Sequence, residues 1–186
     1  MLTMTVRGKK IKVSREFAEA LCDLYDAWNF SRISLYPWLS LPVARQFHRD
    51  PKRFKGTFGG NRSGKTQANA AEVVMSMRGE NYFRPVERQT AQWWVLSEDY
   101  DTAREVQREA ILKWLPQTDV ERNVWSNTEH AIELRNGSSV DFKTWTRGFA
   151  PLQGRALDGI WQDEEVTKEA VINECTMRLI DRRGTL

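Results

Sequence analysis

A glycine-rich octapeptide at residues 59–66 fits the pattern G-x-x-x-x-G-K-[ST] at every fixed position. It follows a short run with two aromatic residues, Phe54–Phe58, for which we predict a buried strand. It precedes an alanine- and methionine-rich run, Lys65–Arg78, for which we predict a helix ended by Gly79. A strand, a tight glycine turn and a helix form the context that this pattern requires. The octapeptide therefore predicts an α/β fold with a phosphate-binding loop.

Each position of the octapeptide has a chemical reason. Glycines let backbone N–H groups turn around phosphate oxygens without a Cβ in the way, and the following helix directs its positive end toward the same charge. Lys65 can reach the β- and γ-phosphates of a nucleotide, and the Thr66 hydroxyl can bind Mg²⁺. The predicted nucleotide-binding residues are Gly59, Gly60, Asn61, Arg62, Ser63, Gly64, Lys65 and Thr66.

Arg62 lies inside the octapeptide and allows two interpretations. As a cation close to the γ-phosphate it would stabilise the charge of the transition state, which makes it a catalytic candidate. Alternatively, it would brace the loop through a salt bridge to one of the acidic residues that occur later in the chain.

Those acidic residues follow a second predicted strand, Gly159–Gln162. Asp163 at the strand end would hold the metal, and Glu164 would orient and deprotonate an attacking water. Glu165 is a competing base, but adjacent side chains point in different directions, which favours Glu164. Acids near a helix N-terminus also occur as partners of the helix dipole. An Asp followed by a Glu favours hydrolysis over phosphoryl transfer to a small molecule.

The rest of the chain alternates between strand-like and helix-like patterns. Trp93 to Leu96 are apolar, as expected of a buried strand, and Asn136-Gly137 predicts a type I′ hairpin turn. The helix predicted over Asp99–Leu115 would bury one face, made of Ala103, Val106, Ala110, Ile111 and Trp114. The remaining predicted elements are a helix over Ser14–Trp28, short helical pieces within 31–52, a strand over Gln92–Ser97, a helix over Asp99–Leu115, strands over His130–Leu134 and Ser139–Trp145, and a helix over Thr167–Arg182. This order predicts a mostly parallel sheet with antiparallel additions.

Composition narrows the class of protein further. With 186 residues the chain can form one domain with a hydrophobic core, but not two large ones. No apolar stretch approaches the roughly 20 residues of a membrane-spanning helix. Cys22 and Cys175 form no C-x-x-C pair, which excludes a disulfide scaffold and favours a reducing compartment. The segment 45–65 holds seven Lys or Arg and one acid, which favours phosphate-bearing partners, with a solvated face as the alternative.

Taken together, the glycine-rich loop and the acidic strand resemble the ATPase domain of a large terminase subunit, the motor that packages DNA into tailed-phage capsids. The resemblance rests on the Arg inside the octapeptide, on the run Leu152–Trp161 leading into Asp163-Glu164-Glu165, and on the closing segment Asp181–Leu186. It covers roughly residues 40–186. Residues 1–40 would form an N-terminal helical, lid-like segment, and residues 41–186 the ATPase core.

The resemblance implies a RecA-like fold with helices on both faces of the sheet, and hydrolysis of Mg-ATP in the host cytoplasm. It implies double-stranded DNA, the portal protein and the small terminase subunit as partners, and a homo-oligomeric ring, a pentamer by resemblance, with no membrane. Gln46 is the nearest match to a glutamine that reads adenine in the family.

One departure from the family pattern is large. A Ser/Thr-rich coupling motif and a nuclease domain would follow a segment like Arg182–Leu186, so we expect no nuclease activity from these residues. Two alternative functions stay open at this point: a helicase-like or remodelling ATPase, and a nucleotide-gated assembly module without efficient turnover.

Overall fold

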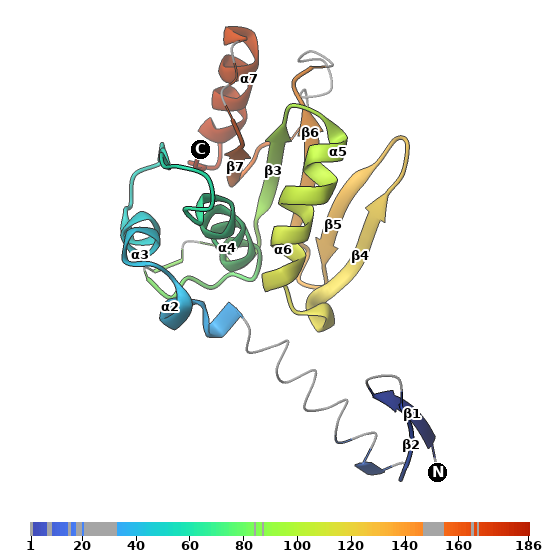
Figure 1. Cartoon of the computed structure of the whole chain (residues 1–186). Coiled ribbons are helices and arrows are strands. Elements are labelled where there is room, and N and C mark those ends of the chain that lie inside the picture. The colour runs from blue at the N-terminus through green and yellow to red at the C-terminus, as the bar shows by residue number, and fades with distance from the viewer. Residues whose placement is uncertain are drawn as a thin grey trace.

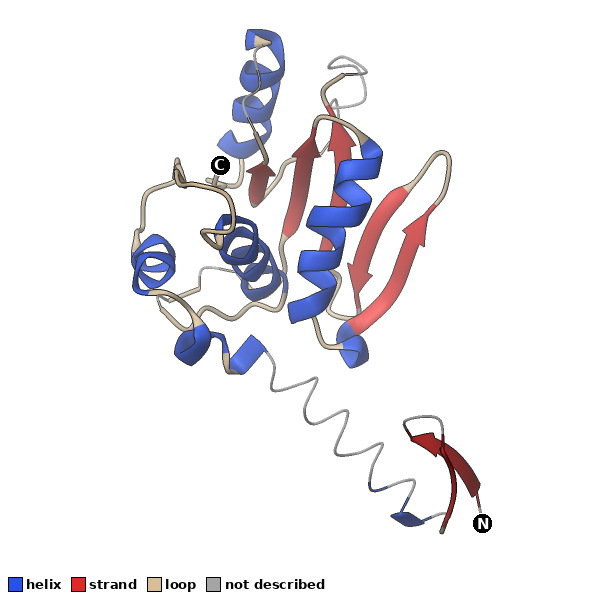
Figure 2. Ribbon diagram, in the orientation of Figure 1, coloured by secondary structure: helices blue, strands red, loops and turns tan. Residues whose placement is uncertain are grey.

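The computed structural model describes residues 2–6, 9–14, 16–17, 20, 33–83, 85–86, 88–146, 155–164, 166 and 168–186. Its centre is a five-stranded sheet in the order β4-β5-β6-β3-β7 (Figures 1 and 2). The strands are β3 (Gln92–Ser97), β4 (Val120–Trp125), β5 (His130–Leu134), β6 (Ser139–Thr144) and β7 (Gly159–Gln162). β3 is parallel to both β6 and β7, whereas β5 is antiparallel to β4 and β6. The predicted parallel sheet with antiparallel additions is confirmed.

Helices cover both faces of this sheet. Trp93 and Val95 of β3 belong to a core cluster with α4 (Lys65–Met77) and α6 (Glu109–Trp114). Trp94 and Leu96 point the other way, because side chains alternate along a strand, and pack in a second cluster with α7 (Glu169–Ile180). Figure 1 shows α4 and α6 side by side on one face and α7 next to β7. The fold is therefore a three-layer α/β/α arrangement.

The predicted helix over Asp99–Leu115 is present but contains a π-helical turn. It is made of α5 (Tyr100–Thr102), the π-helical turn Ala103–Arg108 and α6, here together called the composite helix. Asp99 caps it by accepting a hydrogen bond from the Thr102 N–H at 2.7 Å. The expected burial of Val106 is wrong: it is 42% exposed, and Gln107 is fully buried. Gln107 is four residues from both Ala103 and Ile111 and shares their buried face, whereas Val106 lies at the edge of that face.

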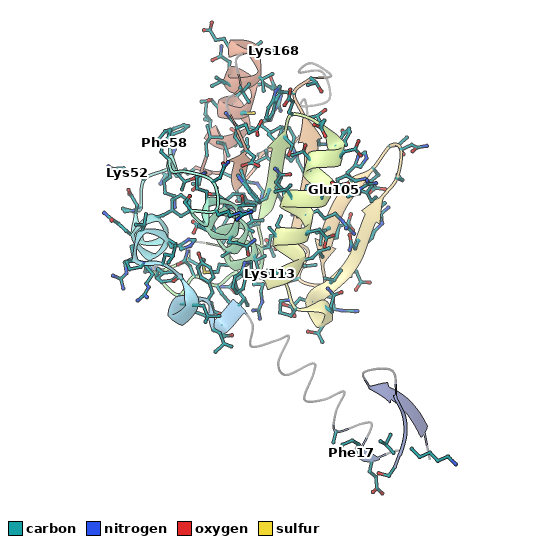
Figure 3. All side chains as sticks on the ribbon, viewed as in Figure 1. Phe17, Lys52, Phe58, Glu105, Lys113 and Lys168 are labelled. Atoms are coloured by element: carbon teal, nitrogen blue, oxygen red, sulfur yellow. The ribbon has the colours of Figure 1, made fainter. Side chains whose placement is uncertain are left out.

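The strand expected over Phe54–Phe58 does not form. Phe54 is 58% exposed and Phe58 is 96% exposed, and Figure 3 shows Phe58 at the outer edge of the molecule. Two backbone bonds tie this part of the chain to Leu186: Lys55 N–H to Leu186 O at 2.9 Å, and Leu186 N–H to Arg53 O at 2.8 Å. Two bonds to one residue do not make a strand.

The hairpin between β5 and β6 is confirmed, but its turn type is not. Gly137 has φ +88°, whereas Asn136 is not among the residues with positive φ, and the Gly137 N–H bonds to Leu134 O at 2.9 Å. A type I′ turn needs positive φ at both central residues. The connection is therefore a tight turn followed by a single left-handed glycine.

Two further regions complete the described chain. Residues 31–52 contain the expected short helices, α2 (Tyr36–Leu39) and α3 (Pro42–Arg49). The strands β1 (Leu2–Val6) and β2 (Lys9–Val13), which were not predicted, form an antiparallel hairpin. Most of the predicted helix Ser14–Trp28 lies outside the described residues. Within the described ranges, no helix has the length and hydropathy to cross a membrane.

Candidate nucleotide-binding site

The octapeptide connects the irregular residues 53–58 to α4 through two left-handed residues. Gly64, the N-cap of α4, has φ +87°, and Arg62 has φ +63°. The Ser63 N–H bonds to Gly60 O at 3.3 Å, which closes a turn inside the loop. α4 has 13 residues, so the loop lies at the positive end of a substantial helix. The turn and the helix after it agree with the sequence prediction for a phosphate-binding loop, whereas the strand predicted before the loop is not formed.

The Lys65 ammonium contacts the loop from which it projects. It donates to Gly59 O at 2.6 Å and to Gly60 O at 3.0 Å, and it lies 3.4 Å from Ser63 Oγ. These acceptors hold a positive charge in the concave side of the loop. Phosphate oxygens are stronger acceptors than peptide carbonyls, because they carry formal charge.

The acidic residues follow β7, as predicted. The Asp163 N–H donates to Leu96 O at 3.0 Å, which extends the pairing of β7 with β3 by one residue. Glu164 then turns away with φ +66°, and the Gln162 side-chain amide donates to its carbonyl at 3.3 Å. A non-glycine residue in this region of φ is strained, and such strain concentrates at functional sites.

A cleft of about 1310 Å³ brings the two halves together. Its lining includes the loop residues Arg62, Lys65 and Thr66 on one side, and Asp163 and Glu164 on the other. Residues far apart in the sequence thus share one cavity, as the sequence analysis expected. Their individual roles stay predictions.

Gln46 lies in a neighbouring cavity of about 1190 Å³, and not in the lining of the first. This second cavity is bounded by α3, the octapeptide and Trp114 of α6, and it shares Lys65 with the cleft. Gln46 is exposed on α3. An adenine-reading role for Gln46 stays a prediction.

Thr185 and Leu186 join the two walls of the cleft. The Ile160 N–H donates to Thr185 O at 2.7 Å, and the Thr185 N–H donates to Asp158 O at 3.0 Å. Leu186 makes the two backbone bonds to residues 53 and 55 described above. The acidic strand and the approach to the glycine-rich loop are therefore held apart at a fixed spacing by two residues.

A divalent cation fits the donors that line the cleft. Mg²⁺ prefers hard oxygen ligands, keeps several waters, and is commonly bound by one or two protein groups together with substrate phosphates. Thr66 and Asp163 supply a hydroxyl and a carboxylate to the same cavity. Outside the masked positions, no group of three or more His, Cys, Asp or Glu could hold a metal alone. The donor set therefore suits Mg²⁺ bound with a nucleotide better than a transition metal in a protein cage.

The Arg62 side chain is exposed, and no salt bridge between described residues involves it. The salt-bridge interpretation of Arg62 therefore gains no support within that part of the chain, although Glu165 lies outside it. Its catalytic role is not tested by the geometry.

Sequence reasoning missed a buried network behind the loop. His48 of α3 is fully buried, with Nε2 2.9 Å from the Tyr36 hydroxyl and Nδ1 2.6 Å from Glu72 Oε2 of α4. The Lys55 ammonium donates to Glu72 Oε1 at 3.2 Å. Burial, and next to it the charge of Glu72, raises the pKa of Tyr36 above its usual range. No sequence motif predicts this network, because each of its residue types also occurs commonly on exposed surfaces.

The architecture and the site together define the class of P-loop nucleotide-binding α/β proteins. The family described as terminase large subunit, T4likevirus-type, N-terminal, matches residues 57–185, and the chain belongs to this family. A search among curated proteins finds no match.

Solved structures support the fold. The large terminase ATPase domain of Thermus phage P74-26 superposes with a TM-score of 0.57 at 20% sequence identity, over 78% of this chain. A point mutant of that same domain gives a TM-score of 0.55 at 20% identity, also over 78% of this chain. The chain spans 62% of the length of each of these two structures. The fold expected from the sequence, a RecA-like core with helices on both faces of a mostly parallel sheet, is confirmed.

Proposed function

We propose that this chain binds and hydrolyses Mg-ATP to power the movement of double-stranded viral DNA into a procapsid. The observation that carries the proposal is the shared cleft, in which the glycine-rich loop faces Asp163 and Glu164. Membership of the terminase family supports the biological setting. The proposed place of action is the host cytoplasm.

The chain's own residues have distinct tasks in this reaction. Loop N–H groups and the positive end of α4 bind the phosphates, and Lys65 moves its hydrogen bonds from Gly59 O and Gly60 O to phosphate oxygens. Glu164 accepts the proton of the attacking water, and Arg62 stabilises the charge that develops on the γ-phosphate. Thr66 and Asp163 would hold Mg²⁺, which neutralises phosphate charge when it is bound.

The proposed partners follow from the family. They are double-stranded DNA, the portal protein, the small terminase subunit and further copies of this chain in a ring. The basic segment 45–65, with seven Lys or Arg, lies next to the nucleotide cleft and supplies positive charge on that side of the molecule.

Two variants separate binding from hydrolysis. We expect Lys65→Met to weaken Mg-ATP binding by roughly tenfold to a hundredfold, because charge-assisted hydrogen bonds contribute about 1.5 to 3 kcal/mol. We expect Glu164→Ala to keep binding but to lower hydrolysis by roughly 10²- to 10⁴-fold, because it removes the general base. Calorimetry measures the first effect, and steady-state phosphate release measures the second.

The control is Glu169→Ala, which removes an exposed carboxylate at the start of α7, away from the cleft lining. Equal hydrolysis by wild type and Glu164→Ala would falsify the assignment of the base. Binding of Mg-ATP without measurable turnover in the wild type, with and without DNA, would instead support a nucleotide-gated assembly module. Unchanged affinity in Lys65→Met would remove the nucleotide site itself.

A further inference from the structure

The composite helix brings one polar side chain to the acidic strand. Gln107 is fully buried, and its Nε2 donates a hydrogen bond to Asp163 Oδ2. The partners come from different layers of the fold, because Gln107 belongs to the π-helical turn Ala103–Arg108 and Asp163 follows β7. A polar side chain that is fully buried in a helix face needs an explanation, and here its partner is a half-buried carboxylate of the cleft lining.

Gln107 lies on the inward face of the composite helix. It is four residues from both Ala103 and Ile111, so helical periodicity places it on the face that these buried residues share, whereas Val106 is 42% exposed. Gln107 also belongs to the π-helical turn Ala103–Arg108, and such turns are frequent at functional sites. A hydrogen-bond donor to Asp163 therefore stands on an otherwise apolar helix face.

The second observation is an unsatisfied acceptor. Gln107 Oε1 is buried without a hydrogen-bond partner in the described part of the chain. A buried amide oxygen without a hydrogen-bond partner destabilises the fold, so folding alone gives no reason to keep it. Water molecules bound to a cation are strong donors, and one held by Asp163 would be the kind of donor that Oε1 lacks.

We propose that Gln107 is a positioning residue for the metal-holding Asp163. Its amide N–H fixes the orientation of the carboxylate through Oδ2 and leaves Oδ1 for the shell of the cation. Its carbonyl oxygen accepts a hydrogen bond from a water of that shell. The inference rests on the proposed function, because it assigns Gln107 a role only if Asp163 serves a nucleotide-bound Mg²⁺. Groups that orient metal ligands in this way commonly affect metal affinity by 10- to 100-fold.

The test measures how binding depends on Mg²⁺, and not turnover. The full chain is titrated with a non-hydrolysable ATP analogue, adenosine 5′-(β,γ-imido)triphosphate, in EDTA and at increasing MgCl₂. We expect Gln107→Met, which is close in size and lacks both polar atoms, to leave the metal-free affinity within about twofold. The Mg²⁺ concentration for half-maximal enhancement should rise by roughly 10- to 100-fold.

A double-mutant cycle identifies the partner of Gln107. Asp163→Asn should remove most of the Mg²⁺ dependence, and adding Gln107→Met should then have no further effect, because the two residues act as one unit. Ile111→Val is the matched control: it alters a fully buried side chain one turn further along the same helix, outside this contact. Its Mg²⁺ dependence should equal that of the wild type. Gln107→Asn, read by the same titration, serves if Gln107→Met does not fold.

The outcomes separate this inference from the proposed function. A wild-type chain with no Mg²⁺-dependent nucleotide binding overturns both. A wild-type chain with normal Mg²⁺ dependence, and a Gln107→Met chain that matches it, overturns only the role of Gln107. Equal weakening of binding with and without metal would assign Gln107 to packing, which also overturns the inference.

Discussion

Arg62 and Glu164 share an unusual backbone conformation on opposite walls of the cleft. Both have φ close to +65°, at +63° and +66°. Residues other than glycine pay a conformational cost there, of order 1 kcal/mol or more. In each case a long charged side chain is carried by a backbone conformation that neither a helix nor a strand contains.

The conformation of Arg62 provides a clean test of its role. Arg62→Gly removes the guanidinium without forcing another Cβ into left-handed backbone, whereas Arg62→Ala also changes loop stability. If the cation acts on the transition state, Arg62→Gly should lower kcat by roughly 10³-fold with little change in nucleotide affinity. Single-turnover hydrolysis and equilibrium binding, measured on the same preparation, give the two quantities. Matched losses in binding and turnover would assign Arg62 to holding the loop.

Among individual residues, the sequence predicts the site residues that belong to a motif. The octapeptide and the Asp163-Glu164 pair can be found from spacing, because phosphate chemistry restricts the residue types. Gln107 cannot, since a lone glutamine within a helical pattern is most often on the surface. Only the three-dimensional register of the composite helix shows that it faces Asp163.

Among the elements, α4 is tied to the segment before the loop by a buried charge network. Glu72 accepts from Lys55 at 3.2 Å and contacts His48 of α3 at 2.6 Å, and the Lys55 and Glu72 side chains are only 4% and 5% exposed. Three pieces of chain that surround the glycine-rich loop, namely α3, residue 55 and α4, therefore converge on one carboxylate. This arrangement fixes where α4 begins relative to α3.

Removing the carboxylate should destabilise the whole fold. Glu72→Ala removes the carboxylate from its pair with the buried Lys55 ammonium, and breaking a buried pair from one side costs about 3 to 5 kcal/mol. Urea denaturation should show a lower midpoint with an unchanged slope. Glu121→Ala is the control, because its pair with Arg135 is exposed on both sides and should contribute under about 1 kcal/mol. A Glu72→Ala midpoint equal to that of the control would contradict a structural role for the network.

The elements also show which patterns carry information. Gln92–Ser97 was predicted with its observed bounds, because a strand buried on both faces is a continuous apolar run. β4 was missed because Glu121, Arg122 and Asn123 are exposed on an edge strand and interrupt its apolar pattern. Pairing with β5 and the packing of Val120 and Trp125 against the core hold the strand. The opposite error occurs at Phe54–Phe58, where the sequence predicts a buried strand but the aromatic residues are exposed.

Over the whole molecule, the two core clusters are separated by the sheet, and Cys175 lies in the cluster under α7. Its side chain is fully buried. Burial, followed by the charge of Glu174, raises the pKa of the Cys175 thiol to about 12. A raised pKa means that the reactive thiolate is scarce at neutral and mildly alkaline pH.

This thiol therefore reports on unfolding of the second core. In a Cys22→Ser background, Cys175 should react with a disulfide reagent at pH 8 roughly 10³-fold more slowly than in urea, because ionisation as well as access is suppressed. The reaction rate followed against urea should rise at the same midpoint as the circular dichroism signal. Labelling in native buffer as fast as in denaturant would show that α7 does not cover this core.

Thr185 and Leu186 connect the two walls of the cleft, and this affects the order in which the cleft forms during synthesis. Lys55 leaves the ribosome about 130 residues before Leu186, and at 5 to 20 residues per second that interval lasts on the order of 10 s. Until then the backbone groups of residues 53 and 55 lack their hydrogen-bond partner, Leu186. A nascent chain therefore cannot complete this cleft early, and we expect ATP, the proposed ligand, to stabilise only chains whose synthesis has passed Leu186.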